Sequence, residues 1–364
     1  MAELIIGTKF KVNGDVDIPR EERISVAAFT GGSKVPGARF RVRQYIPSLE
    51  GEGVDMHELS SPLGQYPPES KWLRPAWGLG SLATNLPRVL ESWMADVTLL
   101  QREMLSTLVT MEPFTRAPRV LDVDDAIFMY HEGRSAQRLA RLSDTVICGN
   151  AYLGDWFSRF NGRIEILPTA VDTDRYVMCP QPKLDGTDVV LGWIGTSANL
   201  KYLEMVEEPI HRILAEFPQV KLRVISDRPP ELKTLPGGRW EFHSWAAETE
   251  ISQIQGMDIG LMPLEDSLWA RGKCSFKMLQ YMSCGVPVVV SPVGMNLEVL
   301  NIGEVGFGPR HLDEWVDALA ALILDDRYRH RLGVNGRTAV ESHFSVKSLA
   351  PKFASILKRA SGRS

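Results

Sequence analysis

The sequence predicts an α/β protein with two doubly wound domains, each built on a parallel sheet. Three observations predict this class. The chain has 364 residues, short β-branched segments alternate with longer amphipathic ones, and a polar, proline-containing stretch lies near the middle. Strand–helix alternation implies parallel strands joined by right-handed crossovers. Two such runs with a linker between them make two domains that face each other across a cleft.

The first run of alternating segments gives a predicted domain over residues 1–180. Its expected strands are Ile24–Phe29, Val54–Leu59, Val97–Leu100, Arg119–Val123, Thr145–Cys148 and Ile164–Leu167. Its expected helices are Leu82–Met94, Gly133–Leu142 and Ala151–Phe160. The polar segment VDTDRYVMCPQPKLDGTD follows and is typical of a linker.

The second run gives a predicted domain over residues 185–344. Its expected strands are Val189–Ile194, Lys221–Ile225, Trp240–His243, Ile259–Met262 and Val286–Val290. Its expected helices are Asn199–Phe217, Glu248–Gln255, Phe276–Cys284 and Leu312–Asp325. A last amphipathic helix, Val346–Ala360, lies beyond this domain, and we expect residues 345–364 to join the first one.

Composition narrows the class of protein. Hydrophobic residues make up 44% and charged residues 24%, which is typical of a globular protein with a full core. A net charge of −4 argues against nucleic acid as the main partner. We expect no signal peptide and no transmembrane helix, since no apolar run reaches about 18 residues. The cysteines form no CxxC pair, which favours free thiols in the cytoplasm; they are Cys148, Cys179, Cys274 and Cys284.

Loops after the strands of the first half carry the first candidate site residues, because open parallel sheets bind ligands beyond the carboxyl ends of their strands. The loop TGGSKVPGARFRVRQ places Gly31 and Gly32 where a backbone can approach a ligand closely. Its glycine spacing is not that of the GxGxxG dinucleotide fingerprint. A glycine-rich surface loop is the alternative.

Three aspartates lie at the end of the strand Arg119–Val123. Asp122 and Asp124 fall on one side of the chain by strand alternation, and Asp125 opens the loop. Three ionised and buried carboxylates would repel one another, so they either face water or bind hydroxyl groups or a cation. Structural aspartates in salt bridges are the alternative.

The second half contains two candidate phosphate-binding loops. LGWIGTSANLKYL puts Gly195 and Thr196 at a strand end and Lys201 in the first turn of a helix, where a bound phosphate would offset its unfavourable position. Exposure of Lys201 to solvent is the alternative. PLEDSLWARGKCSFKMLQYMSCGVPVVVSPVGMNLEVL makes Ser275 a plausible N-cap. Three cations surround that helix start and suit a diphosphate, a solvated basic loop being the alternative; they are Arg271, Lys273 and Lys277.

KCSFKMLQYMSCGVPVVVSPVGMNLEVL resembles the signature region of the glycosyltransferase family 4 group. ILPTAVDTDRY, IGTSANLKYLEMV, VISDRPP and WEFHSWAAETEISQIQGMDIGLMPL resemble further segments of that group, and the likeness covers most of residues 160–345. The resemblance implies the two-domain GT-B fold and a retaining transferase that uses a nucleotide-diphosphate sugar without a required metal. The first domain would bind the acceptor and the second the donor.

Several family positions are altered in this chain. The ribose-binding glutamate falls on Gln280, the sugar-holding glutamate on Gly272 and the phosphate-binding arginine on Thr196, whereas the lysine is kept at Lys201. The catalytic histidine falls on or beside Asp124. A divergent member of the group is therefore expected.

The resemblance and the loops together give the predicted site. Predicted catalytic residues are Asp124, Lys201 and Lys273. Predicted donor-binding residues are Gly31, Gly32, Gly195, Thr196, Asp227, His243, Arg271, Ser275, Lys277, Gln280 and Glu298. Predicted acceptor-side residues are Arg41, Arg102, Asp125 and His131.

The expected reaction is hexosyl transfer from the nucleotide sugar, a substrate, to a hydroxyl group in glycan or glycoconjugate synthesis, with no metal or other cofactor. The acceptor would be a glycan, a lipid-linked molecule or a small molecule, and peripheral contact with the inner face of a membrane fits this setting. A nucleotide-sugar 2-epimerase is one alternative, and it would need no acceptor. A catalytically inactive nucleotide-sugar-binding subunit is another, because the altered positions include Gly272, Thr196 and Asp124.

Overall fold

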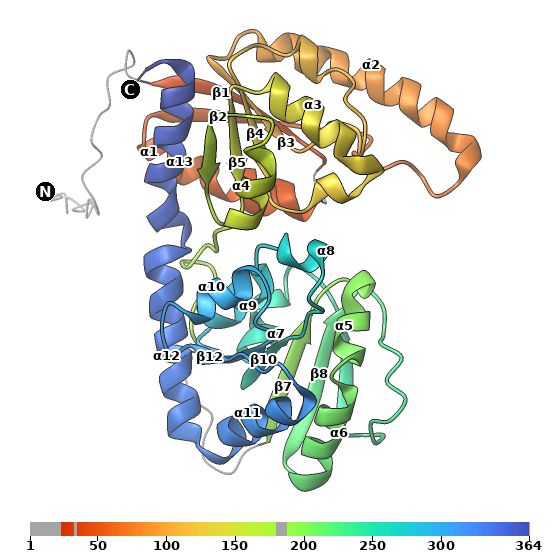
Figure 1. The fold of residues 1–364 in the computed structure, drawn as a ribbon, viewed down its shortest axis with the longest axis vertical. Coiled ribbons are helices and arrows are strands. Elements are labelled where there is room, and N and C mark those ends of the chain that lie inside the picture. The colour runs from red at the N-terminus through yellow and green to blue at the C-terminus, as the bar shows by residue number, and fades with distance from the viewer. Residues whose placement is uncertain (1–22, 33–34, 180–187, 364) are drawn as a thin grey trace, which may run out of the picture.

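The computed structural model describes residues 23–32, 35–179 and 188–363 and contains two six-stranded parallel sheets, one in each half of the chain (Figure 1). The first sheet has the order β2-β1-β3-β4-β5-β6. Its strands are β1 Ile24–Thr30, β2 Val54–Ser60, β3 Val97–Gln101, β4 Arg119–Val123, β5 Thr145–Cys148 and β6 Ile164–Ile166. The second has the order β12-β11-β10-β7-β8-β9. Its strands are β7 Val189–Ile194, β8 Val220–Ser226, β9 Trp240–Ser244, β10 Ile259–Met262, β11 Val288–Val290 and β12 Gly306–Phe307.

Helices cover both sheets, so the predicted α/β class with two doubly wound sheets is confirmed. Those of the first half are α1 Ile46–Gly51, α2 Arg74–Ser92, α3 Arg134–Leu142 and α4 Ala151–Phe157. Those that follow β7 are α5 Leu200–Glu204, α6 Glu207–Glu216, α7 Glu250–Gln255, α8 Leu268–Arg271, α9 Phe276–Ser283, α10 Met295–Leu300, α11 Leu312–Leu324, α12 Asp326–His343 and α13 Val346–Ser361.

The strand orders place the ligand-binding edges of the two sheets. In each sheet the order reverses at one point, between β1 and β3 in the first and between β7 and β10 in the second. Such a switch point opens a crevice at the carboxyl ends of the strands. The two crevices face each other across the space between the domains.

The last two helices connect the domains along one side of the molecule (Figure 1). Although α13 follows the second domain, its residues Phe353 and Leu357 are buried in the core under the first sheet. Phe353 packs edge to face on Tyr45 with ring centroids 5.1 Å apart. Backbone hydrogen bonds from Val171 to Phe344 and from Val346 to Val171 tie the chain between the domains to this helix pair.

Some elements differ from their prediction. The single helix expected over Asn199–Phe217 is two helices, α5 and α6, because Pro209 has no N–H to continue the hydrogen bonding of the first. The strand β12 and the helices α1, α8, α10 and α12 were not predicted. Residues 180–187 of the expected linker lie outside the described residues. None of the described helices is both long enough and apolar enough to cross a membrane.

Candidate active site between the two sheets

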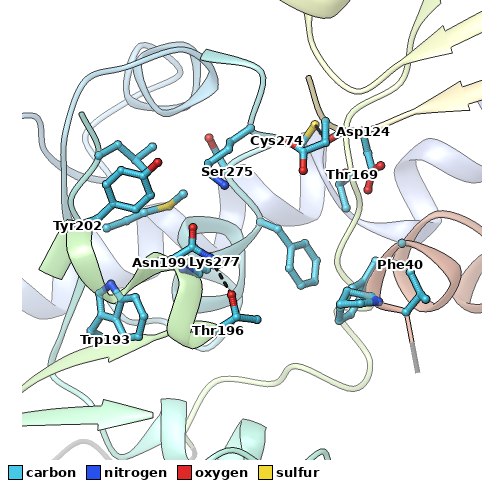
Figure 2. A pocket seen from close by; sticks show the side chains of 18 of the residues that line it. Phe40, Asp124, Thr169, Trp193, Thr196, Asn199, Tyr202, Cys274, Ser275 and Lys277 are labelled. Carbon is cyan, nitrogen blue, oxygen red and sulfur yellow. Dashed lines mark hydrogen bonds between the residues drawn. The ribbon is translucent and has the colours of Figure 1, made fainter. Parts of the chain in front are cut away.

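A cavity of about 630 Å³ lies between the domains at the carboxyl edges of both sheets, and Figure 2 shows it from close by. Loops that follow β1, β3, β4, β7 and β10 all contribute to it. The predicted residues that line it are Arg102, Asp124, Asp125, Thr196, Lys273, Ser275 and Lys277. The predicted cleft site thus assembles from both halves of the chain.

Lys277 forms part of the second-domain wall. It lies in the first turn of α9, and its ammonium sits 4.6 Å from the centroid of the Trp193 ring. Burial lowers the pKa of Lys277 to about 7, and the nearby charge of Lys273 acts in the same direction. Gly195 makes room for this side chain, because a Cβ there would lie 2.3 Å from the Lys277 Nζ. Gly195 is therefore adjacent to the cavity without lining it.

The loop before α9 carries Ser275 and Lys273. Ser275 holds the predicted N-cap position with a left-handed backbone, φ 51°, although its side chain makes no capping hydrogen bond. The Lys273 ammonium lies 5.4 Å from the Trp269 ring centroid. Burial lowers the pKa of Lys273, and the negative charge of Asp125 opposes this. Free backbone N–H groups and two lysines therefore surround the same end of the cavity.

Asn150 of the first domain holds this loop in place. Its Oδ1 accepts a hydrogen bond from the Leu153 N–H, 2.9 Å, and thereby caps α4. Its Nδ2 donates to the carbonyl oxygens of Arg271, 3.3 Å, and Lys273, 3.1 Å. Sequence reasoning missed Asn150. Its one signal was an asparagine directly before the predicted helix that follows the strand Thr145–Cys148.

The first-domain wall carries two aspartates and an arginine. The Arg102 guanidinium donates from Nε to Asp124, 2.7 Å, and its Nη2 lies 3.6 Å from Asp125. Burial opposes ionisation of Asp124, but the charges of Arg102 and Arg41, together with the hydrogen bond from Arg102, hold the pKa of Asp124 below its ordinary value. Burial raises the pKa of Asp125, against the attraction of Arg102 and Lys273. The two neighbouring carboxyl groups therefore differ in their ease of ionisation.

Arg41 and Asp122, a residue of β4, form a fully buried ion pair. Arg41 donates from Nε to Asp122, 3.0 Å, and from Nη1 to the Leu167 carbonyl, 2.8 Å. Both side chains are 1% exposed. Arg41, expected on the acceptor side, therefore lies in the core of the first domain, because Asp122 on β4 draws it there.

Lys201 and Gln280 do not line the cavity. The Lys201 side chain is 60% exposed, as the solvent-exposed alternative expects, and its ammonium lies 3.4 Å from Glu265 and 4.8 Å from the ring centroid of Tyr202, which does line the cavity. Gln280 is buried and donates from Nε2 to the Tyr176 hydroxyl, 3.0 Å. Gly31 makes close contact with the side chain of Gln65.

Several other predicted residues make contacts elsewhere in the structure. Asp227 accepts from the N–H and hydroxyl of Ser197, and His243 and Arg271 pair with Glu241 and Asp266. The predicted residues that do not line the cavity are Gly31, Gly32, Arg41, His131, Gly195, Lys201, Asp227, His243, Arg271, Gln280 and Glu298. Their roles in binding stay predictions.

Aromatic residues line the cavity as well, and sequence reasoning missed them. Trp193 of the second domain and Phe40 of the first lie on opposite sides of the pocket (Figure 2). Phe276 of the second domain also lines it, and the rings of Phe40 and Phe276 are 4.0 Å apart between centroids. A tryptophan at the end of the buried strand β7 was the available signal. These rings give the cavity flat apolar surfaces beside its charged end.

Comparisons with known proteins agree with this geometry. Residues 188–325 match the family model described as "Glycosyl transferases group 1". The resemblance to glycosyltransferases that the sequence predicts is therefore confirmed in the second half of the chain. A search of curated proteins finds no match.

Three solved structures with the same two-domain fold align over most of this chain. Sucrose-phosphate synthase from Thermosynechococcus elongatus aligns with a TM-score of 0.66 and 14% identity, over 93% of this chain and 99% of that one. HepE from Anabaena, solved with UDP-glucose, aligns with a TM-score of 0.66 and 16% identity, over 93% of this chain and 100% of that one. WaaG, a glycosyltransferase involved in lipopolysaccharide biosynthesis, aligns with a TM-score of 0.61 and 14% identity, over 92% of this chain and 99% of that one. The GT-B fold is thus confirmed, and the low identities fit a divergent sequence.

Proposed function

We propose that this chain is a retaining glycosyltransferase that moves a hexose from a nucleotide-diphosphate donor to a hydroxyl group, without a required metal, in glycan or glycoconjugate synthesis. The observation that carries the proposal is the convergence of Lys273, Lys277 and the start of α9 on one end of the cavity between two switch points. The family match over residues 188–325 and the UDP-glucose in HepE support a nucleotide sugar as donor.

The cationic end of the cavity would bind the diphosphate. Breaking the glycosidic bond increases the negative charge on the leaving diphosphate, so Lys273 and Lys277 would stabilise the transition state more than the bound donor. The backbone N–H groups at the start of α9 add donors that need no proton transfer.

Asp124 would act on the acceptor side. Because Arg102 and Arg41 together keep its pKa low, Asp124 stays ionised and can orient an acceptor hydroxyl or stabilise positive charge on the sugar ring. The aromatic walls exclude water, which competes with the acceptor. No covalent nucleophile is part of the proposal.

We also propose a cytoplasmic protein that touches the membrane surface through α2. The exposed face of this helix and its flanks carry Leu79, Leu82, Leu86, Leu90, Trp72 and Trp93. The buried face is mostly polar, with Ser81, Asn85, Arg88 and Ser92 beside the single apolar residue Val89. A helix that turns its apolar side outward suits a lipid interface, where tryptophans are favoured.

The test is a thermal-shift series with UDP, GDP, ADP and CDP, followed by NMR of the matching nucleotide sugar. A diphosphate that binds the folded protein raises its melting temperature by mass action. Release of the sugar with its anomeric configuration kept, in added EDTA, supports the proposal. A new nucleotide sugar identifies an epimerase, and binding without turnover identifies an inactive subunit.

A further inference from the structure

A second cavity opens beside the first and is not used by the proposed donor site. It encloses about 360 Å³, which is within the range of small-molecule sites. Tyr66, Arg102 and Asp125 line both cavities, so the two spaces meet at these residues. We call the smaller cavity the side pocket.

Aromatic side chains from both domains form the walls of the side pocket. Tyr66 and Tyr130 come from loops after β2 and β4, and both are about half exposed, 54% and 50%. Trp269 comes from α8 of the second domain, and its ring meets Tyr130 edge to face with centroids 5.6 Å apart. Exposed rings of this kind offer flat apolar surfaces to a ligand that carries its own hydroxyl groups.

Apart from Ile127, the remaining lining is polar, and it contains no free positive charge among the described residues. Arg102 is the cation that lines the pocket, and it is already paired with Asp124, 2.6 Å, and Asp125, 3.6 Å. Glu103 is 6% exposed and accepts a hydrogen bond from the Ser135 hydroxyl, 2.8 Å. Carboxylates accept hydrogen bonds from hydroxyl groups and repel anions. The pocket therefore favours a neutral ligand rich in hydroxyl groups.

Backbone strain is concentrated at the same place. Arg102 and Thr107 both line the pocket with positive φ, 62° and 67°. Such strained conformations persist only where the surrounding structure holds them, and they cluster at active sites and ligand-binding sites.

We propose that the side pocket binds the acceptor as a neutral, polyhydroxylated ring, with Trp269 and Tyr130 as its stacking walls. This inference rests on the proposed transferase function, and it names the acceptor class and the residues that select it. The reacting hydroxyl would point through the junction at Asp125 toward the donor. Because Trp269 belongs to the second domain and lies beneath Lys273, the pocket is complete only when the domains are closed.

The test measures binding of simple rings to the full chain. Saturation-transfer NMR would be recorded with methyl glucoside, methyl galactoside, methyl mannoside and myo-inositol, in the presence of UDP. We expect ring protons of at least one probe to receive saturation. Trp269→Ala and Tyr130→Ala should each lower the affinity for that probe about tenfold, whereas Trp269→Phe should keep most of the wild-type affinity. Trp72→Ala is the matched control, since Trp72 is 93% exposed and lines neither cavity.

The outcomes separate this inference from the proposed function. The side pocket is supported if Tyr130→Ala no longer binds the ring probe but keeps its UDP affinity within twofold of wild type. UDP binding with no response from any probe, or equal binding by Trp269→Ala and Trp72→Ala, overturns it and leaves the transferase proposal intact. Absence of binding by any nucleoside diphosphate would instead remove the transferase proposal itself.

Discussion

Lys277 links the chemistry of the site to pH. Its pKa of about 7 means that the free protein holds a neutral amine above neutral pH and an ammonium below it. A bound diphosphate favours the ammonium and raises this pKa, so binding takes up a proton near neutral pH. Diphosphate affinity should therefore fall at least about tenfold from pH 7 to pH 9.

Calorimetry in buffers of different ionisation enthalpy measures this proton uptake directly. Lys277→Met is the matched variant, and it should bind weakly with a flatter pH profile. The remaining slope would come from Lys273, whose pKa is also lowered. A wild-type affinity that does not change between pH 7 and pH 9 would contradict the assignment.

Asp124 and Asp122 offer a comparison of two nearby aspartates in different surroundings. Asp124 lines the cavity, whereas Asp122 is buried against Arg41. Asp124→Asn should lower donor hydrolysis at least ~100-fold and leave UDP affinity within twofold. Asp122→Asn should leave hydrolysis per folded molecule unchanged and lower the free energy of unfolding by about 3 kcal/mol, because it disrupts a buried ion pair.

Hydrolysis of the nucleotide sugar by water, UDP affinity and urea unfolding decide this comparison on both variants. If Asp124→Asn is as active as wild type while its stability drops, Asp124 serves only as the partner of Arg102.

At the scale of elements, the start of α9 depends on the first domain. Asn150 accepts from one N–H to cap α4 and donates to two carbonyls of the loop that carries Lys273. Asn150→Asp keeps the cap but loses both donated hydrogen bonds. We expect diphosphate affinity to fall about tenfold, since a loop that is less fixed must be ordered on binding. The melting temperature should change by less than about 4 °C.

Isothermal titration with UDP and a thermal melt check this prediction. Asn161→Asp is a suitable control, because the Asn161 amide donates to carbonyls within the first domain and away from the cavity. Equal loss of affinity in both variants would show that Asn150 has no specific effect on the loop.

Helix α2 gives a prediction about the membrane. Leu86→Glu places a charge in the middle of the exposed apolar face, where Leu86 is 50% exposed. It should reduce sedimentation of the protein with phosphatidylcholine–phosphatidylglycerol vesicles several-fold, because a charge costs about 2–3 kcal/mol in an apolar membrane environment. Donor hydrolysis in solution should not change. Leu324→Glu, at an exposed leucine of α11, is the matched control. If the wild-type protein does not sediment with the vesicles, the proposed membrane contact is contradicted.

The sequence predicts those elements whose pattern is local. Buried β-branched segments identify eleven of the strands, whereas β12 spans only Gly306–Phe307 and carries no pattern. α2 begins at Arg74, eight residues before its expected start, because Pro75 is tolerated in a first turn and Gly78 and Gly80 do not stop the helix.

Site residues, too, could be predicted only where their signal lies in the local sequence. Lys273 and Lys277 could be predicted because a cation near a helix start is a local signal. Asn150 and Trp269 could not, because their partners are distant in sequence and only the packing of two domains brings them together. Arg41 was misplaced for the same reason, since its partner Asp122 lies on β4, 81 residues further along the chain.

At the scale of the whole molecule, one buried carboxylate joins the two domains and the chain between them. Glu250 at the start of α7 accepts hydrogen bonds from Arg39 of the first domain, 3.3 Å, from the Tyr176 hydroxyl, and from Trp245 Nε1, 2.8 Å. Glu250 is 5% exposed on its side chain, so it is screened little by solvent. The contact with Arg39 exists only when the domains are closed, and it therefore contributes to closure.

Arg39→Gln should therefore favour opening of the cleft without unfolding either domain. Glu250 keeps two donors in the variant, so the melting temperature should stay within about 4 °C of wild type. Loss of about 1 kcal/mol from the closed state should weaken donor binding about fivefold, because the donor must then restore closure. Small-angle X-ray scattering should show a larger radius of gyration for the free variant, and saturating UDP should remove the difference.

Arg359→Gln, which breaks the Arg359–Glu165 pair within the first domain, should scatter like wild type with and without UDP. If the Arg39 and Arg359 variants give the same curves, Arg39 does not hold the cleft closed, and the contacts between Phe40 and Phe276 must do so instead.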